Sequence, residues 1–193
     1  MRILLIGEYY STNLGDPVLC QTVENSIYES FPDVEVVPFD MSGNTGFNSR
    51  YTPKVYYNSR KILFGVLNRI PLVEKKSVIF RAIKPWQERY LITMCMLDHV
   101  LSLKKYDLAV FAGGSIFMDY FSGVIYGIIR QLSKKRIPVI FHACGMSKLT
   151  DDTTITLRKA LKYKLIWVSA LISRLQNIRK RWDQGKFFGQ VEV

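Results

Sequence analysis

The sequence is poor in the residues that build metal and disulfide sites. It holds three cysteines and two histidines in 193 residues, and Cys20, Cys95 and Cys144 stand far apart. An odd number of widely spaced cysteines, without a C-x-x-C pair or a Cys/His cluster, indicates neither a disulfide framework nor a zinc site. We therefore expect no metal and free thiols, as in a reducing cytoplasm.

Long apolar runs are missing as well. The chain starts with a brief apolar run that ends at Gly7 and Glu8, which is too short for a secretory signal peptide. The longest late run, residues 165–172, falls well short of the ~20 residues that span a bilayer. These two absences predict a soluble, cytoplasmic protein.

Two nucleotide-binding signatures are absent. The sequence contains neither the G-x-G-x-x-G dinucleotide fingerprint nor the G-x-x-x-x-G-K-[ST] phosphate loop. Nothing in it therefore indicates a nicotinamide or ATP site, and no cofactor is expected.

The positive charge is unevenly distributed. The net charge is +11, and residues 158–193 alone hold nine Lys/Arg against two acidic residues. No nucleic-acid-binding motif accompanies this charge, so we expect no nucleic-acid partner. A basic tail over residues 169–193 is equally compatible with peripheral association at the anionic inner membrane surface and with a negatively charged substrate.

The opening stretch predicts a strand, a polar loop and a helix. Residues 2–7 form a short apolar run bounded by glycine, which is typical of a buried parallel strand. Asp16 stands where a helix N-cap belongs, with Pro17 at the first helical position. The helix that follows has one apolar stripe of residues spaced by four, namely Leu19, Val23, Ile27 and Phe31.

The loop between this strand and helix is the first candidate site. It carries Glu8, Ser11, Asn13, Gly15 and Asp16. In open α/β sheets ligands bind at the carboxyl ends of the strands, and helix N-termini attract anions. A strand–helix turn without a ligand would have the same sequence features, so both interpretations stay open.

The middle of the chain predicts one more strand and a long helix. Residues 33–38 favour a strand ended by Pro38, and residues 40–59 favour a long loop without periodicity. The segment after Pro85 has an apolar stripe typical of a core helix, made of Trp86, Tyr90, Met94, Leu97 and Leu101. We interpret the lone His99 on this helix as structural.

Two later strands bring further candidates. A strand over residues 107–111 runs into Gly113, Gly114 and Ser115, and a helix over residues 120–135 follows. Adjacent glycines permit positive φ and a close approach of ligand to backbone, although a tight turn without ligand is as good an interpretation. A strand over residues 138–145 contains His142, favoured as a core histidine, and ends at Gly145.

The alternation of strands and helices predicts an α/β fold with a doubly wound, mostly parallel, Rossmann-like sheet. We expect this domain to span residues 1–168, including a helix that starts at Asp151 and a last strand within residues 164–169. Residues 169–193 form a divergent basic tail.

Three blocks of the sequence resemble the polysaccharide pyruvyl transferase family. They are residues 2–7 with Asn-Leu-Gly-Asp at 13–16, the segment DLAVFAGGS at 107–115, and PVIFHACG at 138–145. The resemblance covers about the first of two facing, GT-B-like domains. It implies transfer of a pyruvyl group from phosphoenolpyruvate, the donor substrate, to a sugar or polysaccharide-precursor acceptor in surface polysaccharide biosynthesis.

The resemblance and the loops together give a set of expected substrate-binding residues, while the catalytic residues stay unassigned. The set is Asn13, Gly15, Asp16, Gly113, Gly114 and Ser115, with Glu8, His142 and Gly145 as weaker candidates.

The tail departs from the family pattern. Family members show an Arg-Asp turn where residues 168–171 read Val-Ser-Ala-Leu, and they continue into a second domain. We therefore expect a truncated chain that is inactive alone and prone to self-association through an exposed apolar wall. The alternatives are a glycosyltransferase-like nucleotide-sugar-binding domain and a non-catalytic sugar- or anion-binding α/β module.

Overall fold

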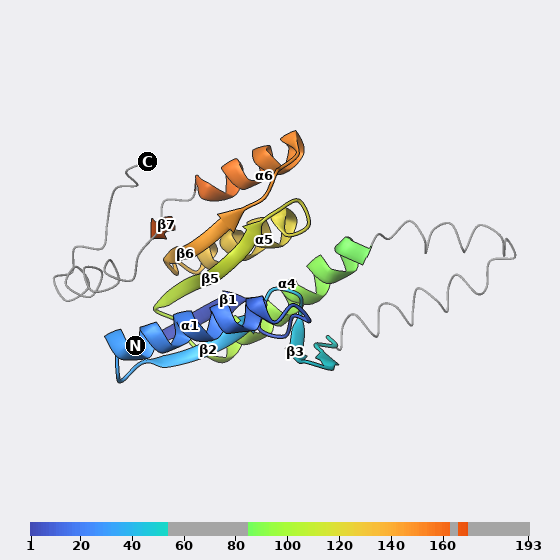
Figure 1. The fold of residues 1–193 in the computed structure, drawn as a ribbon. Helices are drawn as coiled ribbons and strands as arrows, with labels where there is room; N and C mark the ends of the chain where they lie inside the picture. Colours follow the sequence, from blue (N-terminus) through green and yellow to red (C-terminus); the bar gives the residue numbers. More distant parts are fainter. Residues whose placement is uncertain (54–84, 163–165, 170–193) are drawn as a thin grey trace, which may run out of the picture.

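A five-stranded parallel sheet forms the centre of the computed structural model, which describes residues 1–53, 85–162 and 166–169 (Figure 1). The strand order is β2-β1-β5-β6-β7. The strands are β1 (Arg2–Gly7), β2 (Glu35–Asp40), β5 (Leu108–Phe117), β6 (Val139–Met146) and β7 (Ile166–Ser169). The helices are α1 (Gly15–Ser30), α4 (Pro85–Leu103), α5 (Ser122–Lys134) and α6 (Asp151–Leu161). The predicted Rossmann-like α/β class is confirmed.

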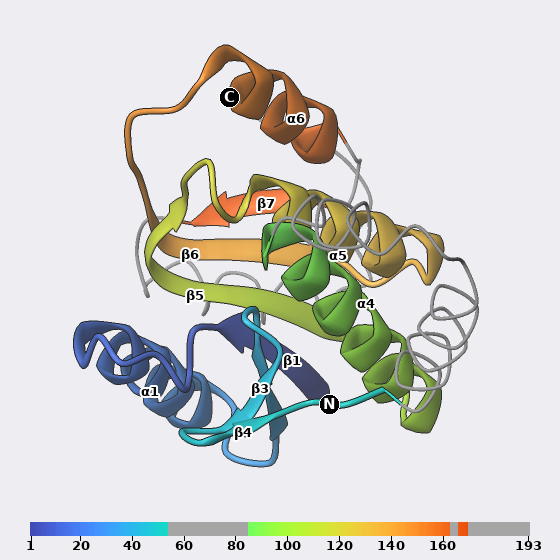
Figure 2. The same ribbon diagram turned by 90° about the vertical axis from the view of Figure 1, so that its right-hand side faces the viewer.

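Helices cover both faces of the sheet. Figure 2 shows α1 apart from the row formed by α4, α5 and α6. Along β1, Ile3 and Leu5 pack in one cluster with α1, whereas Leu4 and Ile6 pack in the other cluster with α4, α5 and α6. Because both faces are covered, both sets of alternating side chains must be apolar, and this explains the continuous apolar run at residues 2–7.

The chain changes direction across the sheet between β1 and β5. It first steps from β1 to β2 at one edge, then returns to the other side of β1 and continues through β5, β6 and β7. This order contains a topological switch point between β1 and β5, where the connections leave toward opposite faces.

The second strand and the segment after it differ from the prediction. β2 runs on to Asp40 and includes Pro38, which is exposed. Proline is tolerated there because β2 is an edge strand and needs no donor on its outer side. The described part of residues 40–59 is not an unstructured loop, since β3 (Asn44–Gly46) and β4 (Ser49–Arg50) form an antiparallel hairpin. Residues 54–59 lie outside the described residues.

The start of α1 also differs from the prediction. The helix begins at Gly15, with Leu14 at the N-cap position, so Asp16 is not the N-cap. Pro17 lies in the first turn, where backbone N–H groups have no partner within the helix. Val23 and Ile27 are buried as expected, whereas Leu19 is 40% exposed and Cys20 takes its place in the core.

The turn that the sequence predicts at Gly113, Gly114 and Ser115 is instead part of a strand. These residues lie within β5, which continues to Phe117 and pairs irregularly with β6 beyond Gly114. Gly145 likewise lies inside β6, one residue before its end. β5 is longer than predicted and β6 ends one residue later, because each strand supplies the other with backbone partners past the glycines. The irregular pairing is typical of a β-bulge.

The buried stripe of α5 agrees with the prediction, since Val124, Ile125, Ile128, Ile129 and Leu132 are all buried. Within the ranges that the structure describes, no helix is long and apolar enough to cross a membrane.

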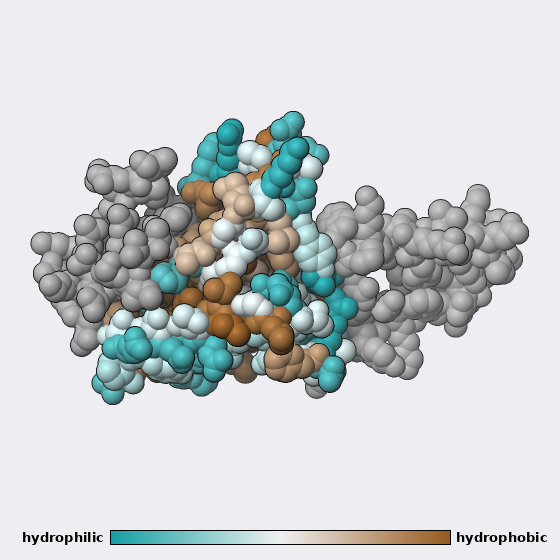
Figure 3. All heavy atoms as spheres, in the orientation of Figure 1, coloured by the Kyte–Doolittle hydropathy of each residue, from teal (hydrophilic) through white to brown (hydrophobic). Residues whose placement is uncertain are grey.

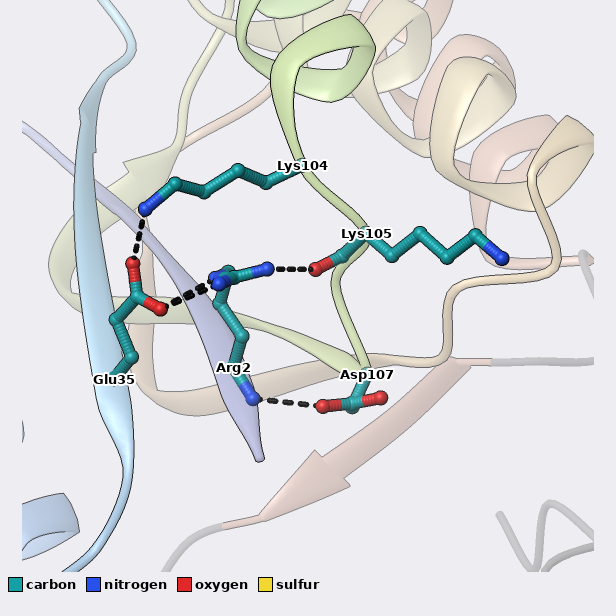
Figure 4. A network of polar contacts seen from close by, with 5 residues as sticks. All are labelled: Arg2, Glu35, Lys104, Lys105 and Asp107. Atoms are coloured by element: carbon teal, nitrogen blue, oxygen red, sulfur yellow. Dashed lines mark hydrogen bonds and ion pairs between the residues drawn. The ribbon is translucent and has the colours of Figure 1, made fainter.

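A charged network ties the amino ends of the first strands together (Figure 4). The Arg2 guanidinium forms an ion pair with Glu35 at 2.6 Å, and Lys104 Nζ lies 2.6 Å from the other Glu35 oxygen. The Arg2 backbone N–H donates to Asp107 at 2.7 Å, and its side chain donates to the Lys105 carbonyl at 3.0 Å. The network therefore links β2, β1 and the residues just before β5.

The hydrogen bond from Arg2, followed by that from Lys104, lowers the pKa of Glu35 from 4.5 to about 2. A carboxylate whose pKa is lower in the folded state than in the unfolded state stabilises the fold at any pH above the unfolded-state pKa. This contribution is lost as the pH falls through the folded-state pKa. The window for Glu35 therefore runs from about pH 4.5 down to about pH 2.

We predict that Glu35→Gln lowers the free energy of unfolding at pH 7 by a small amount, because the network is exposed to solvent. The difference from the unmodified chain should shrink steadily below pH 4.5, measured by urea unfolding at a series of pH values. Glu29→Gln on the exposed side of α1 is the control. A difference for Glu35→Gln that stays constant from pH 7 to pH 3 would contradict the assignment.

Candidate functional site

The carboxyl ends of β1 and β5 lie side by side at the switch point. The connection after β1 leads to α1 on one face, and the connection after β5 leads to α5 on the other. We call the residues around these ends the switch-point edge (residues 8–16, 40–44, 113–117 and 143–147). Ligands bind at this place in open α/β sheets because the diverging connections leave the strand ends uncovered.

Asp16 connects the loop after β1 with β5. Its Oδ2 accepts a hydrogen bond from Ser11 Oγ at 2.9 Å, and its backbone N–H donates to the Asn13 carbonyl at 3.1 Å. A Cβ on Gly114 would lie 3.5 Å from Asp16 Oδ1. The carboxylate therefore lies against the β5 backbone, and two blocks separated by about half of the chain meet here.

The third block meets the second at Ser115 and Gly145. A Cβ on Gly145 would lie 3.4 Å from Ser115 Oγ and 3.5 Å from the Gly114 carbonyl. Gly114 has φ +81°, and Ala143 on the neighbouring strand has φ +51°. A left-handed non-glycine residue such as Ala143 costs about 1–3 kcal/mol, and such residues are concentrated at functional sites.

One buried carboxyl group, Asp40, and one half-buried carboxyl group, Glu8, flank this meeting point. Glu8 accepts a hydrogen bond from Ser42 Oγ at 2.7 Å. Asp40 is 1% exposed and accepts from the backbone N–H groups of Tyr10, Ser42 and Asn44 at 2.9, 2.8 and 3.4 Å. Burial raises the pKa of both carboxyl groups, against the opposing effect of these hydrogen bonds. Asp40 thereby fastens the loop after β1 to the start of the β3–β4 hairpin.

A cation also reaches this edge. The Arg89 guanidinium carbon lies 4.3 Å from the centroid of the Tyr120 ring, in the connection between β5 and α5. The Arg89 charge favours the ionised forms of Glu8 and Asp40 and so offsets a small part of the effect of burial on the pKa of each.

Apolar side chains border the edge on the α1 side. Leu14 is 78% exposed and Val18 59% exposed, and Leu19 lies against Gly113 and Gly114. Figure 3 shows apolar surface gathered in the middle of this view, toward the start of α1.

Two of the predicted site residues are not brought into this cluster. Asn13 is exposed, and its Oδ1 accepts from the Gly15 backbone N–H at 3.4 Å, within its own loop. His142 is 4% exposed, so its predicted location in the core is confirmed, although a core histidine with satisfied ring nitrogens was expected. Burial lowers the pKa of His142, and its Nδ1 has no hydrogen-bond partner among the described residues.

Sequence reasoning missed Asp40, Arg89 and Tyr120 as site residues. Asp40 had a usable signal, since it directly follows an apolar run, but the strand was predicted to end at Pro38. The sequence contains no signal that marks Arg89 and Tyr120 as site residues, because each lies beside a long apolar segment and only the folded chain brings them together.

The edge is rich in hydrogen-bonding groups. Among the residues that the structure describes, no group of three or more His, Cys, Asp or Glu side chains is placed to hold a metal ion. Carboxylate oxygens, hydroxyl groups and uncovered strand ends are suited to polar, hydroxyl-rich ligands.

No family model matches this chain, and no curated protein matches it. The class of the chain therefore rests on its fold, a parallel α/β sheet of Rossmann-like topology.

We predict that Gly114→Ala lowers the free energy of unfolding by about 1 kcal/mol, because alanine is strained at positive φ. Its Cβ would meet nothing closer than 3.5 Å, so a steric clash is not the cause. Urea unfolding monitored by circular dichroism measures the change.

Gly113→Ala is the matched control. Gly113 is outside the left-handed region, and its added Cβ would lie 3.4 Å from the Ala143 carbonyl, an ordinary contact. Equal losses in the free energy of unfolding for the two variants would show that the positive φ of Gly114 is not the reason for a glycine at this position.

Proposed function

We propose that this chain is a polysaccharide pyruvyl transferase-like protein whose switch-point edge binds the sugar acceptor. One observation carries the proposal: the three sequence blocks that resemble the family, far apart in the chain, meet at one edge. They do so through Asp16, Gly114, Ser115 and Gly145. Each block ends at the carboxyl end of one of three adjacent strands, β1, β5 and β6, so one ligand could contact all three.

The charge of the edge favours the acceptor over the donor. Three carboxyl groups, Glu8, Asp16 and Asp40, lie there, and among the described residues Arg89 is the cation whose charge acts on Glu8 and Asp40. Phosphoenolpyruvate carries a phosphate and a carboxylate and calls for several cations. Carboxylates accept hydrogen bonds from sugar hydroxyls, so the acidic edge suits a neutral polyol.

The transfer chemistry gives Glu8 a role in this proposal. A sugar hydroxyl adds to C2 of phosphoenolpyruvate, its proton leaves, and C3 gains a proton. A second hydroxyl then displaces phosphate to close the ketal. A carboxylate with a raised pKa is a good acceptor for the hydroxyl proton, and Glu8 is such a group at the edge.

We predict that Asp16→Ala weakens the binding of galactose- and mannosamine-type acceptors about tenfold, the effect of losing a hydrogen bond to a charged group. Isothermal titration calorimetry with methyl β-galactoside and N-acetylmannosamine measures it. Asp33→Ala, in the exposed connection between α1 and β2, is the control and should bind as the unmodified chain does.

Two results would contradict the proposal. One is the absence of acceptor binding, or acceptor binding that Asp16→Ala leaves unchanged. The other is thermal protection by a nucleotide sugar but not by phosphoenolpyruvate with acceptor, which would favour a glycosyltransferase-like domain.

A further inference from the structure

Arg89 presents a guanidinium group whose donors are unused within the described part of the chain. It forms no ion pair and no hydrogen bond with any described residue, although it is only partly exposed. A guanidinium carries five N–H donors and no acceptor, so a partly buried arginine normally has partners for several of them.

The setting of Arg89 orients these donors. Its guanidinium lies over the Tyr120 ring at 4.3 Å, a distance at which the cation is attracted to the ring face. The contact with the ring uses the charge of the guanidinium and gives its N–H groups no oxygen or nitrogen acceptor. A planar fork held in this way matches a carboxylate or phosphate group with two parallel hydrogen bonds.

The location is also that of a ligand contact. Arg89 follows the first turn of α4, and Tyr120 lies after the carboxyl end of β5, so the pair stands beside the switch-point edge. Its charge acts on Glu8 and Asp40, yet neither carboxylate forms an ion pair with it. Both carboxylates take their hydrogen bonds elsewhere, from Ser42 and from backbone N–H groups.

We infer that Arg89, held on the ring of Tyr120, binds the carboxylate or phosphate group of a ligand at the switch-point edge. The inference rests on the proposed function for the location of the ligand. Two ligands could supply the anion: an acceptor sugar that carries an acidic group, such as a uronic acid, or the phosphoenolpyruvate donor. In either case Arg89 supplies the contact for the anionic group, while the carboxylates of the edge remain the acceptors for sugar hydroxyl groups.

A competing role for Arg89 is to offset the charges of Glu8 and Asp40 without contacting ligand. Such a role would make Arg89→Gln lower the stability of the chain at neutral pH and leave the affinity for anions unchanged.

The experiment compares glucuronate, galactose and phosphoenolpyruvate as probes, by isothermal titration calorimetry on the whole chain. We expect Arg89→Gln to weaken the binding of the anionic probe about tenfold or more and to leave galactose binding unchanged. Arg89→Lys should recover only part of the loss, because a lysine ammonium cannot form two parallel hydrogen bonds. Tyr120→Leu should weaken anion binding as well, whereas Tyr120→Phe keeps the ring and should not.

Arg130→Gln, an exposed arginine on α5, is the matched control for the loss of one positive charge. A loss confined to glucuronate identifies an acidic acceptor sugar, and a loss confined to phosphoenolpyruvate identifies the donor. The inference is overturned when Arg89→Gln binds both anions as the unmodified chain does, or when neither anion binds at all.

The outcomes also separate this inference from the proposed function. Suppose that Asp16→Ala weakens galactose binding, whereas Arg89→Gln changes the binding of neither galactose nor the anions. This result would support the acceptor site and contradict the role of Arg89. Suppose instead that the anions bind, that Arg89→Gln weakens their binding, and that galactose does not bind. This result would support the role of Arg89 and contradict the acceptor site.

Discussion

The reversal of strand order between β1 and β5 is the constraint on which the rest of the structure depends. A parallel strand must be followed by a crossover, and the crossovers after β1 and β5 lie on opposite faces of the sheet. The two strand ends are therefore uncovered, and whatever polar residues follow them are brought together. Asp16 from one connection and Gly114 on the other strand meet there for this reason.

The two ends of the sheet treat charge in different ways. At the amino end, Arg2, Glu35 and Lys104 pair with one another at 2.6 Å, and the charges hold strands together. At the carboxyl end, Asp40 is buried and Glu8 is half-buried, both have raised pKa values, and Arg89 has no ion-pair partner among the described residues. Keeping charged groups buried without pairing them is costly, which is the pattern of a site that serves a ligand.

The sequence predicted the layers of this fold because the relevant signals are local. Residues 2–7 are apolar throughout because both faces of that strand are covered. The α5 helix has a single apolar stripe because only one of its faces is covered. The end of β5 could not be predicted in this way. Its extension past Gly113 and Gly114 depends on the backbone of β6, and no residue near the glycines carries that information.

The site was predicted in outline and missed in part for the same reason. Gly114 was recognised because it follows a predicted strand, and Asp16 because it stands at the predicted start of a helix. The expected N-cap role of Asp16 was wrong, since its carboxylate accepts from Ser11 rather than capping α1. Arg89 reaches the edge from a helix that packs on the far face from α1, a relation that only the tertiary structure contains.

Ligand binding at the switch-point edge is tested most directly by NMR. The measurement follows the backbone amide shifts of the labelled chain during titration with galactose and with glucuronate. The account predicts shifts that saturate together at residues 8–16, 113–115 and 145, with the amides around Arg2, Glu35 and Lys104 at the opposite end of the sheet unchanged. Shifts confined to that opposite end, or no saturable shift with either sugar, would contradict it.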